Sequence, residues 1–161
     1  MDLLWAPWRL KYVQSTGKRG CFLCEAASSK EDLKNLLLYR GQYGFIILNK
    51  YPYNNGHLMV APYRHISDFL ELSKDEIYNL SELIKLSLRI LNAAYRPHGF
   101  NIGMNLGSVA GAGLAAHLHI HIVPRWRGDT NFMPVISDTK VIPESLIDAY
   151  NKLKRKLEEV G

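Results

Sequence analysis

Short runs of apolar and β-branched residues, broken by glycine, proline and asparagine, predict several β-strands between residues 36 and 123. The predicted strands are Leu36–Arg40, Tyr43–Asn49, His57–Pro62, Phe100–Leu106 and Ala116–Val123. Gly41-Gln42 separates the first two strands, so we expect them to form a hairpin. The glycine-rich segment Gly107–Gly113 separates the last two. The pattern therefore predicts a sheet built mainly from strands joined by turns.

Two segments have a helical period instead. Ser73, with Glu76 three residues later, forms a capping-box pattern, and Pro97 predicts where this long helix ends. Its expected apolar face consists of Ile77, Leu80, Ile84, Leu88, Leu91 and Tyr95. A C-terminal helix is expected over about residues 143–160, with its apolar stripe at Leu146, Tyr150, Leu153, Leu157 and Val160. Strands and helices do not alternate regularly, so the predicted fold is α+β, with a mostly antiparallel sheet, one long central helix and a C-terminal helix.

Composition narrows the class of protein. The chain has 161 residues, the size of one domain, so we expect a single domain over residues 1–161. Hydrophobic residues make up 47% and charged residues 22%, which excludes a disordered or low-complexity protein. The presence of only two cysteines excludes a disulfide-dense secreted scaffold. Lysine and arginine outnumber aspartate and glutamate by 20 to 15, and this net charge of +5 favours anionic partners such as nucleotides, polyphosphates or nucleic acid.

Neither a signal peptide nor a membrane span is predicted. The opening residues MDLLWAPWRL contain Asp2, Pro7 and Arg9 where a signal peptide requires an apolar core. The longest stretch without Asp, Glu, Lys or Arg, Pro97–Pro124, contains four histidines and five glycines, which is unsuitable for a bilayer span. We therefore expect a cytoplasmic protein with no membrane partner.

The most specific local feature is the row His117-Leu118-His119-Ile120-His121. In a strand, residues two apart point to the same face, so the three imidazoles would line one face and the apolar residues the other. Three titratable rings are costly as core filler, so the row predicts a functional site. Two chemistries fit it: a metal site, because imidazole is a common ligand, and nucleophilic attack by one imidazole on phosphorus.

A second feature is the pair Cys21 and Cys24 in a Cys-x-x-Cys spacing. Such a pair is either half of a zinc site or a redox pair. A thioredoxin-type redox pair would follow a strand and open a helix, whereas here the glycine-bounded segment Gly17–Gly20 comes first. Half of a Cys₂His₂ zinc site is therefore favoured, with a redox pair and two unliganded thiols as alternatives. The spacing of later histidines does not fit a C₂H₂ finger.

The segment HLHIHIV at residues 117–123 resembles the signature of the histidine triad (HIT) superfamily of nucleotide hydrolases and transferases. Upstream, LNKYPYNNGHLMVAPYRH resembles the second conserved block of this family. Within the family, WAPWR, GFNIGMNLG and VPRW are similar to bacterial diadenosine tetraphosphate phosphorylases and to the fragile-histidine-triad branch. The resemblance covers Cys21 to about Trp126 and implies a HIT-like fold.

The resemblance also implies a role for each matching residue. His119 would attack the α-phosphorus of a nucleotide, with adenine the expected base, and form a nucleotidyl-histidine intermediate. His121 would hydrogen-bond the phosphate or the leaving-group oxygen, and His57 would lie behind the nucleophile as a supporting hydrogen-bond partner. The residues expected to bind substrate are Asn49 at the ribose, Asn105 at the phosphate, and Ile47, Met59 and Phe22 around the base.

By the same resemblance, Cys21, Cys24, His65 and His117 would bind structural zinc and tie an N-terminal segment, about residues 1–35, to the sheet. No organic cofactor is expected, and relatives imply at least a homodimer. The chain departs from the family at Gly111–Leu114, where many relatives have a polar residue before the triad. Ser108 or backbone groups could replace that residue.

Three functions remain open. The leading one is cleavage of a dinucleoside polyphosphate such as diadenosine tetraphosphate, and Arg125-Trp126-Arg127 together with WAPWR favours phosphate over water as the second substrate. The second is a zinc-stabilised module that binds nucleotides or nucleic acid without turnover, which leaves His119 and His121 unexplained. The third is a metal-dependent hydrolase with the histidine row as its ligands. Nucleic acid is not the expected partner.

Overall fold

The computed structural model describes residues 20–131, 136–137 and 141–161. The WAPWR motif at residues 5–9 and the rest of the N-terminal segment before Gly20 lie outside the described residues.

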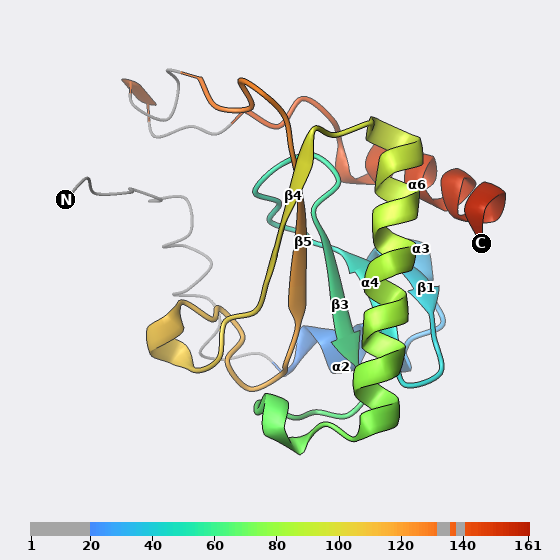
Figure 1. Ribbon diagram of the computed structural model, residues 1–161, viewed down its shortest axis with the longest axis vertical. Coiled ribbons are helices and arrows are strands. Elements are labelled where there is room, and N and C mark those ends of the chain that lie inside the picture. The colour runs from blue at the N-terminus through green and yellow to red at the C-terminus, as the bar shows by residue number, and fades with distance from the viewer. Residues whose placement is uncertain (1–19, 132–135, 138–140) are drawn as a thin grey trace.

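An antiparallel sheet of five strands forms the centre of the structure, in the order β1-β2-β3-β5-β4 (Figure 1). The strands are β1 (Leu37–Arg40), β2 (Gly44–Leu48), β3 (Leu58–Pro62), β4 (Gly99–Gly103) and β5 (Ile120–Arg125). With the helices described below, this confirms the predicted α+β fold. Strands β1 and β4 form the two edges of the sheet.

The last two strands differ from their predicted ranges. Strand β4 ends at Gly103 instead of Leu106, and β5 begins at Ile120 instead of Ala116. Just before β5, the backbone N–H of Leu118 donates to the carbonyl of Ile66, 2.6 Å away, rather than to a neighbouring strand. The first part of the histidine row therefore lies in a bent segment that leads into β5.

The long helix α4 (Lys74–Tyr95) begins with the predicted capping box. The Ser73 hydroxyl accepts from the backbone N–H of Glu76, and the Glu76 carboxylate accepts from the backbone N–H of Ser73. The predicted apolar face is partly wrong, because Ile77 is 38% exposed. The buried face is rotated toward Glu76, Leu80, Leu83, Ser87, Ile90 and Leu91. It includes two polar side chains because both are hydrogen-bonded.

The C-terminal helix α6 (Leu146–Val160) begins after Ser145, which caps it, slightly later than predicted. It packs beside α4 and against the edge strand β1. The Tyr150 hydroxyl donates to the carbonyl of Leu37, and the Lys154 ammonium donates to that of Leu38, each at 3.0 Å. Helix α6 thus occupies part of the β1 edge.

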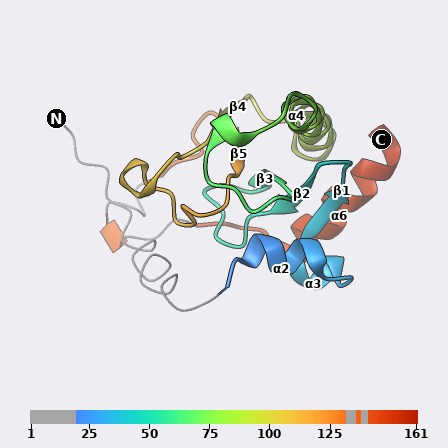
Figure 2. The ribbon, with the colours of Figure 1, turned by 90° about the horizontal axis from the view of Figure 1, so that it is seen from below.

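Two short helices, α2 (Phe22–Ser28) and α3 (Asp32–Asn35), were not predicted. They lie on one side of the sheet and α4 on the other (Figure 2). Among the described helices, none combines the length and the apolar character that crossing a bilayer requires.

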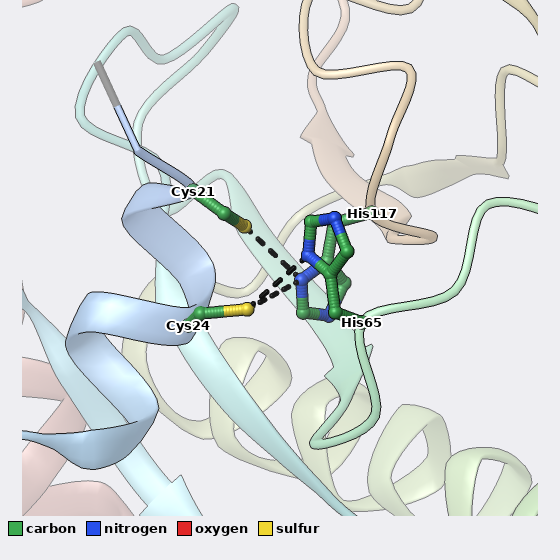
Figure 3. Close-up of side chains that lie close together, drawn as sticks. All are labelled: Cys21, Cys24, His65 and His117. Carbon is green, nitrogen blue, oxygen red and sulfur yellow. Dashed lines mark hydrogen bonds between the residues drawn. The ribbon is translucent and has the colours of Figure 1, made fainter.

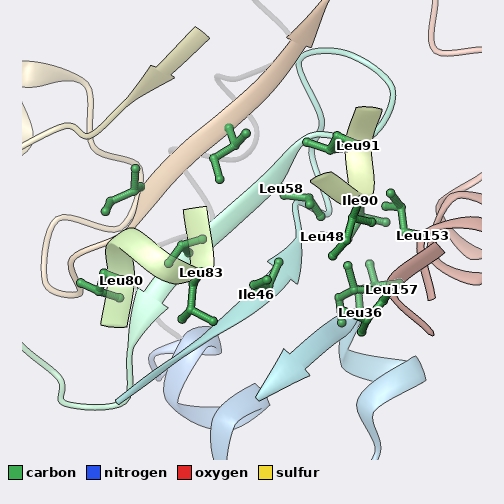
Figure 4. Packing of buried hydrophobic residues seen from close by; sticks show 14 of the residues in the cluster. Leu36, Ile46, Leu48, Leu58, Leu80, Leu83, Ile90, Leu91, Leu153 and Leu157 are labelled. Carbon is green, nitrogen blue, oxygen red and sulfur yellow. The ribbon is translucent and has the colours of Figure 1, made fainter. Parts of the chain in front are cut away.

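Strands β2 and β3 are buried on both faces of the sheet. The larger hydrophobic cluster joins the sheet to α4 and α6 (Figure 4). A smaller cluster lies beneath α2 and includes Leu23, Phe45, Ile47 and Met59. Met59 lies opposite His121 in the β3–β5 register, so the His121 side chain is on the α2 side of the sheet. This face carries the candidate site.

Candidate active site and metal centre

The three histidines of the row keep the predicted alternation. Leu118, Ile120 and Ile122 belong to the larger hydrophobic cluster on the α4 side. His117 is fully buried and His119 is 7% exposed. The rings of His119 and His121 meet edge to face, with their centroids 4.8 Å apart. The row thus brings its imidazoles together on the side of the sheet away from α4.

The hydrogen bond of His119 determines which ring nitrogen is reactive. Its Nδ1 lies 2.8 Å from the backbone carbonyl oxygen of His117, and a carbonyl oxygen only accepts. In the neutral ring the proton is therefore on Nδ1, and the lone pair is on Nε2. Burial lowers the pKa of His119, although this hydrogen bond opposes the shift. The site presents an imidazole with a lone pair at Nε2.

His121 is oriented by His57. The backbone N–H of Tyr53 donates to Nδ1 of His57 at 3.1 Å, so His57 carries its proton on Nε2. That nitrogen lies 3.0 Å from Nδ1 of His121 and donates to it. The neutral His121 ring then carries its own proton on Nε2. The chain of contacts prepares His121 to donate a hydrogen bond to a ligand.

His57 was expected behind the nucleophile, whereas its hydrogen bond is to His121. The β3–β5 register accounts for this contact. Leu58 lies opposite Ile122 and Met59 opposite His121, so His57 at the start of β3 lies diagonal to His121.

A cavity of about 540 Å³ opens beside His121. Its walls near His121 include Asn105 and Gly111, and the Asn105 amide donates to the Gly111 carbonyl at 3.4 Å. From the same loop, Ala110 also lines the cavity, whereas Ser108 is exposed and is not part of the lining. The structure thus brings Asn105, but not Ser108, to the histidines.

The residues expected to bind ribose and base lie on the same side of the sheet. Ile47 and Met59 are paired across β2 and β3, only 2% and 3% exposed, and Phe22 packs against their cluster from α2. The Asn49 oxygen accepts from the backbone N–H of Tyr51 at 2.8 Å, and its amide nitrogen lies 3.3 Å from Nδ1 of His57. Their contacts with a nucleotide stay predictions.

Cys21, Cys24, His65 and His117 form a compact cluster (Figure 3). Cys21 caps α2 and Cys24 lies in its first turn, whereas His65 follows β3 and His117 precedes β5. The four ligand atoms lie within 4.8 Å of one another. Nδ1 of His117 is 3.1 Å from Sγ of Cys21 and 3.4 Å from Sγ of Cys24. In a tetrahedral zinc site, sulfur and nitrogen ligands are separated by roughly 3.5 Å, so the cluster could hold a metal ion with small adjustments.

The second nitrogen of His117 supports this interpretation. Its Nε2 donates to the carbonyl of Pro62 at 2.9 Å, so the Nδ1 lone pair faces the two sulfur atoms. Histidine ligands of metals commonly donate their other N–H to a carbonyl in this way. Burial, with the neighbouring Cys21, raises the pKa of the Cys24 thiol to about 11, a disadvantage that a bound dication would reverse. The donor set therefore fits a metal better than it fits two free thiols.

A polar cluster at the end of β5 was not found by sequence reasoning. The Asp129 carboxylate accepts from Arg125 at 2.6 and 2.9 Å, from the Asn54 amide at 2.8 Å and from the backbone N–H of Trp126 at 3.1 Å. The Arg125 guanidinium holds the pKa of Asp129 well below its usual range. Asn54 and Asp129 are far apart in the sequence, and no motif links them. The cluster fastens the loop before His57 to the end of β5.

The fold is α+β, and its antiparallel sheet carries hydrogen-bonded histidines on one face, with His121 at an open cavity. This arrangement is typical of an enzyme that uses histidine in catalysis. The chain belongs to the HIT family, because the HIT domain model matches residues 30–128. This confirms the expected family and the expectation of a HIT-family enzyme. Cys21 and Cys24 precede the matched region.

Sequence and structure comparisons agree with this assignment. The chain is 40% identical over 156 residues to a Mycobacterium tuberculosis protein named AP-4-A phosphorylase, with 92% of this chain and 80% of the relative covered. A Sulfolobus tokodaii histidine triad nucleotide-binding protein has a TM-score of 0.66 and 25% identity, covering 86% of this chain and 93% of its own. A zinc-bound histidine triad family protein from Mycobacterium smegmatis has a TM-score of 0.68 at 20% identity, covering 87% and 94%, and shows the shared fold.

Proposed function

We propose that this protein cleaves dinucleoside polyphosphates, such as diadenosine tetraphosphate, by transferring a nucleotidyl group to His119. The observation that carries the proposal is the 2.8 Å hydrogen bond from Nδ1 of His119 to the His117 carbonyl, because it leaves the Nε2 lone pair available for attack. The similarity to a relative named AP-4-A phosphorylase supports this substrate class.

In the first step, Nε2 of His119 forms a bond to the α-phosphorus, and the bond from that phosphorus to the bridging oxygen breaks. The leaving nucleoside polyphosphate takes the electron pair. The Nε2–H of His121 donates a hydrogen bond that stabilises the negative charge on the departing oxygen, and the leaving polyphosphate departs as an anion without taking a proton. His57 supports that donation through its contact with Nδ1 of His121.

In the second step, a phosphate oxygen attacks the nucleotidyl-histidine, and the P–N bond breaks to restore His119. Phosphate yields a nucleoside diphosphate, whereas water would yield a monophosphate. We favour phosphate because the relative is named a phosphorylase and because Arg127, shortly after the histidine row, adds positive charge. Asn105 would orient the α-phosphate, Asn49 the ribose, and Ile47, Met59 and Phe22 the adenine base.

Cys21, Cys24, His65 and His117 would hold zinc. With four protein ligands, the ion has no open position for substrate, so it would supply stability and not catalysis. Because His117 also provides the carbonyl that accepts from His119, the ligand set would help to hold the nucleophile in place. We further propose a single HIT-like domain that acts as a homodimer in the cytoplasm.

The test is incubation with diadenosine tetraphosphate, with and without inorganic phosphate, followed by chromatography of the products. ADP and ATP that form only with phosphate would support phosphorolysis, whereas AMP and ATP without phosphate would make the protein a hydrolase. His119→Ala is expected to abolish turnover and to leave the melting temperature nearly unchanged. Turnover retained by this variant would exclude His119 as the nucleophile.

A further inference from the structure

The cavity beside His121 continues along the sheet as a groove over β4 and β5, which we call the β4 groove. Its lining includes Asn101, Gly103, His121, Val123 and Arg125. Gly103 lies opposite His121 and Asn101 opposite Val123, so these positions share one face of the sheet. Arg125 lies four residues after His121, roughly 13 Å along a strand. The groove is therefore an elongated site with His121 at one end.

Gly103 keeps the floor of the groove open. Among the described residues, no heavy atom lies within 4 Å of a Cβ atom built at this position. Gly103 is not among the glycines with positive φ, so its backbone does not require glycine. Gly103 is the last residue of β4, and glycine in a strand often marks a place where a ligand or another backbone approaches closely. The missing side chain leaves free space directly opposite His121.

The far end of the groove is polar but carries little net charge. The Arg125 guanidinium donates to Oδ1 of Asn101 at 2.7 Å and to both oxygens of Asp129. The Asp129 side chain is only 8% exposed, and it balances the charge of Arg125. Because the charge of Arg125 is already balanced by Asp129, this end of the groove is better suited to hydrogen bonds with ribose hydroxyls and base edges than to binding another phosphate.

We propose that the β4 groove binds the leaving nucleoside polyphosphate of the substrate. This inference rests on the proposed function, in which one nucleotidyl group becomes attached to His119 and the other half departs past His121. The first phosphate of the departing half lies at His121 and Asn105, and the later phosphates, which ADP lacks, pass over Gly103. Its ribose and base lie toward Asn101 and Arg125.

Gly103→Val tests the proposal, because it adds a side chain over the floor without a clash in the folded chain. Two substrates with the same bond to break are compared: diadenosine tetraphosphate, whose leaving group is ATP, and ADP, whose leaving group is phosphate. ADP turnover is followed by exchange with labelled phosphate or by release of AMP. We expect the variant to lower kcat/KM for diadenosine tetraphosphate at least roughly tenfold and to change ADP turnover less than about twofold.

Gly99→Val adds the same side chain at the far end of the groove, because Gly99 lies opposite Arg125 and has no heavy atom of the described residues within 4 Å of a Cβ position. It should lower kcat/KM for diadenosine tetraphosphate and leave ADP turnover unchanged, because only the longer leaving group reaches this end. Gly103→Ala, a smaller intrusion, should have an intermediate effect, and melting temperatures confirm that each variant is folded.

Equal losses for both substrates, or no loss for either, would overturn the groove proposal. These outcomes can be told apart from a failure of the proposed function. If the proposed function is wrong, the unmodified protein turns over neither diadenosine tetraphosphate nor ADP.

Discussion

At the scale of single residues, reactivity depends on where the imidazole protons lie. His119 is oriented by a carbonyl only two residues earlier, whereas His121 is oriented by His57, from another strand. The contact between His119 and the His117 carbonyl is local, so it depends only on the backbone bend before β5. The contact between His121 and His57 depends on the register between β3 and β5.

Replacement of His57 should therefore impair departure of the leaving group. His57→Phe keeps the ring volume but removes the donor to Nδ1 of His121, and we expect kcat to fall roughly 100-fold. His57→Gln keeps a donor and should retain more activity. Steady-state kinetics with diadenosine tetraphosphate, and with an adenylate ester whose leaving group is a much weaker base and needs less stabilisation by a hydrogen bond, check the cause. An equal loss with both substrates would mean that His57 acts on binding or folding instead.

The sequence predicts which side chains share a face of the sheet more reliably than it predicts which atoms form hydrogen bonds. A period of two places the three imidazoles on one face even though His117 and His119 lie outside β5. The metal-ligand set came from family resemblance, and the structure gathers its members. The contact between His57 and His121 could not be predicted, because it requires knowledge of the strand register.

At the scale of elements, α2 depends on a distant arginine. Arg40 in β1 donates to the carbonyls of Ala27 at 2.7 Å and Ser29 at 2.6 Å, and to Asp32 in α3 at 2.7 Å. These contacts satisfy carbonyl groups at the end of a helix of seven residues. Because α2 carries both cysteines, Arg40 supports the metal cluster indirectly.

Arg40→Met should speed the release of zinc several-fold, because α2 loses the contacts that hold its end. Arg40→Lys keeps the charge but not the fork of donors, so we expect an intermediate rate. The measurement is zinc transfer to a coloured chelator, with circular dichroism to monitor helix content. A rate equal to that of the unmodified protein would exclude this supporting role.

Helix α4 contains a buried charge that makes stability depend on pH. Glu76 accepts from Arg64 at 2.6 and 2.8 Å, and Arg64 together with Ser73 lowers the pKa of Glu76 to about 2, from 4.5. Because the pKa is lower in the folded state, this contribution to stability is complete above pH 4.5 and declines as the pH falls toward 2.

Glu76→Gln should lower the free energy of unfolding at pH 7 by about 1–2 kcal/mol, because half-exposed Arg64 is screened by solvent. The difference from the unmodified protein should shrink as the pH falls below 4.5. Denaturant unfolding at several pH values checks this. Glu82→Gln, at an exposed pair with Lys85, is the control and should change stability by less than about 0.5 kcal/mol. A difference independent of pH would contradict the ion-pair explanation.

Elements follow from the sequence where their signals are local. The capping box of α4 needs only Ser73 and Glu76, and it was predicted correctly. The buried face of α4 was partly wrong, because Glu76 and Ser87 are buried through hydrogen bonds that an apolar pattern does not reveal. Helix α2 is too short for a hydrophobic period, and its end depends on Arg40, which lies outside the helix.

At the scale of the whole molecule, removal of the proposed zinc ion tests whether the cluster of Cys21, Cys24, His65 and His117 joins α2 to the sheet. Treatment with a chelator should lower the melting temperature first, and activity should be lost as the protein unfolds. A closed set of four ligands leaves no position at which substrate could meet the metal. Parallel measurements of melting temperature, zinc content and turnover check the order of events. Immediate loss of turnover, reversed by zinc and without a change in melting temperature, would instead indicate a catalytic metal.

The two edge strands, β1 and β4, differ in how freely a strand of another molecule could pair with them. Tyr150 and Lys154 of α6 occupy carbonyls of β1, whereas the residues Asn101, Ile102 and Gly103 of β4 are exposed. A unit with two open edges could join others without limit, as fibres do. Helix α6 covers part of the β1 edge, so a neighbour added by strand pairing would meet its free edge at β4. Strand addition limited to β4 would stop at a pair, and α6 would then act as a built-in chain terminator.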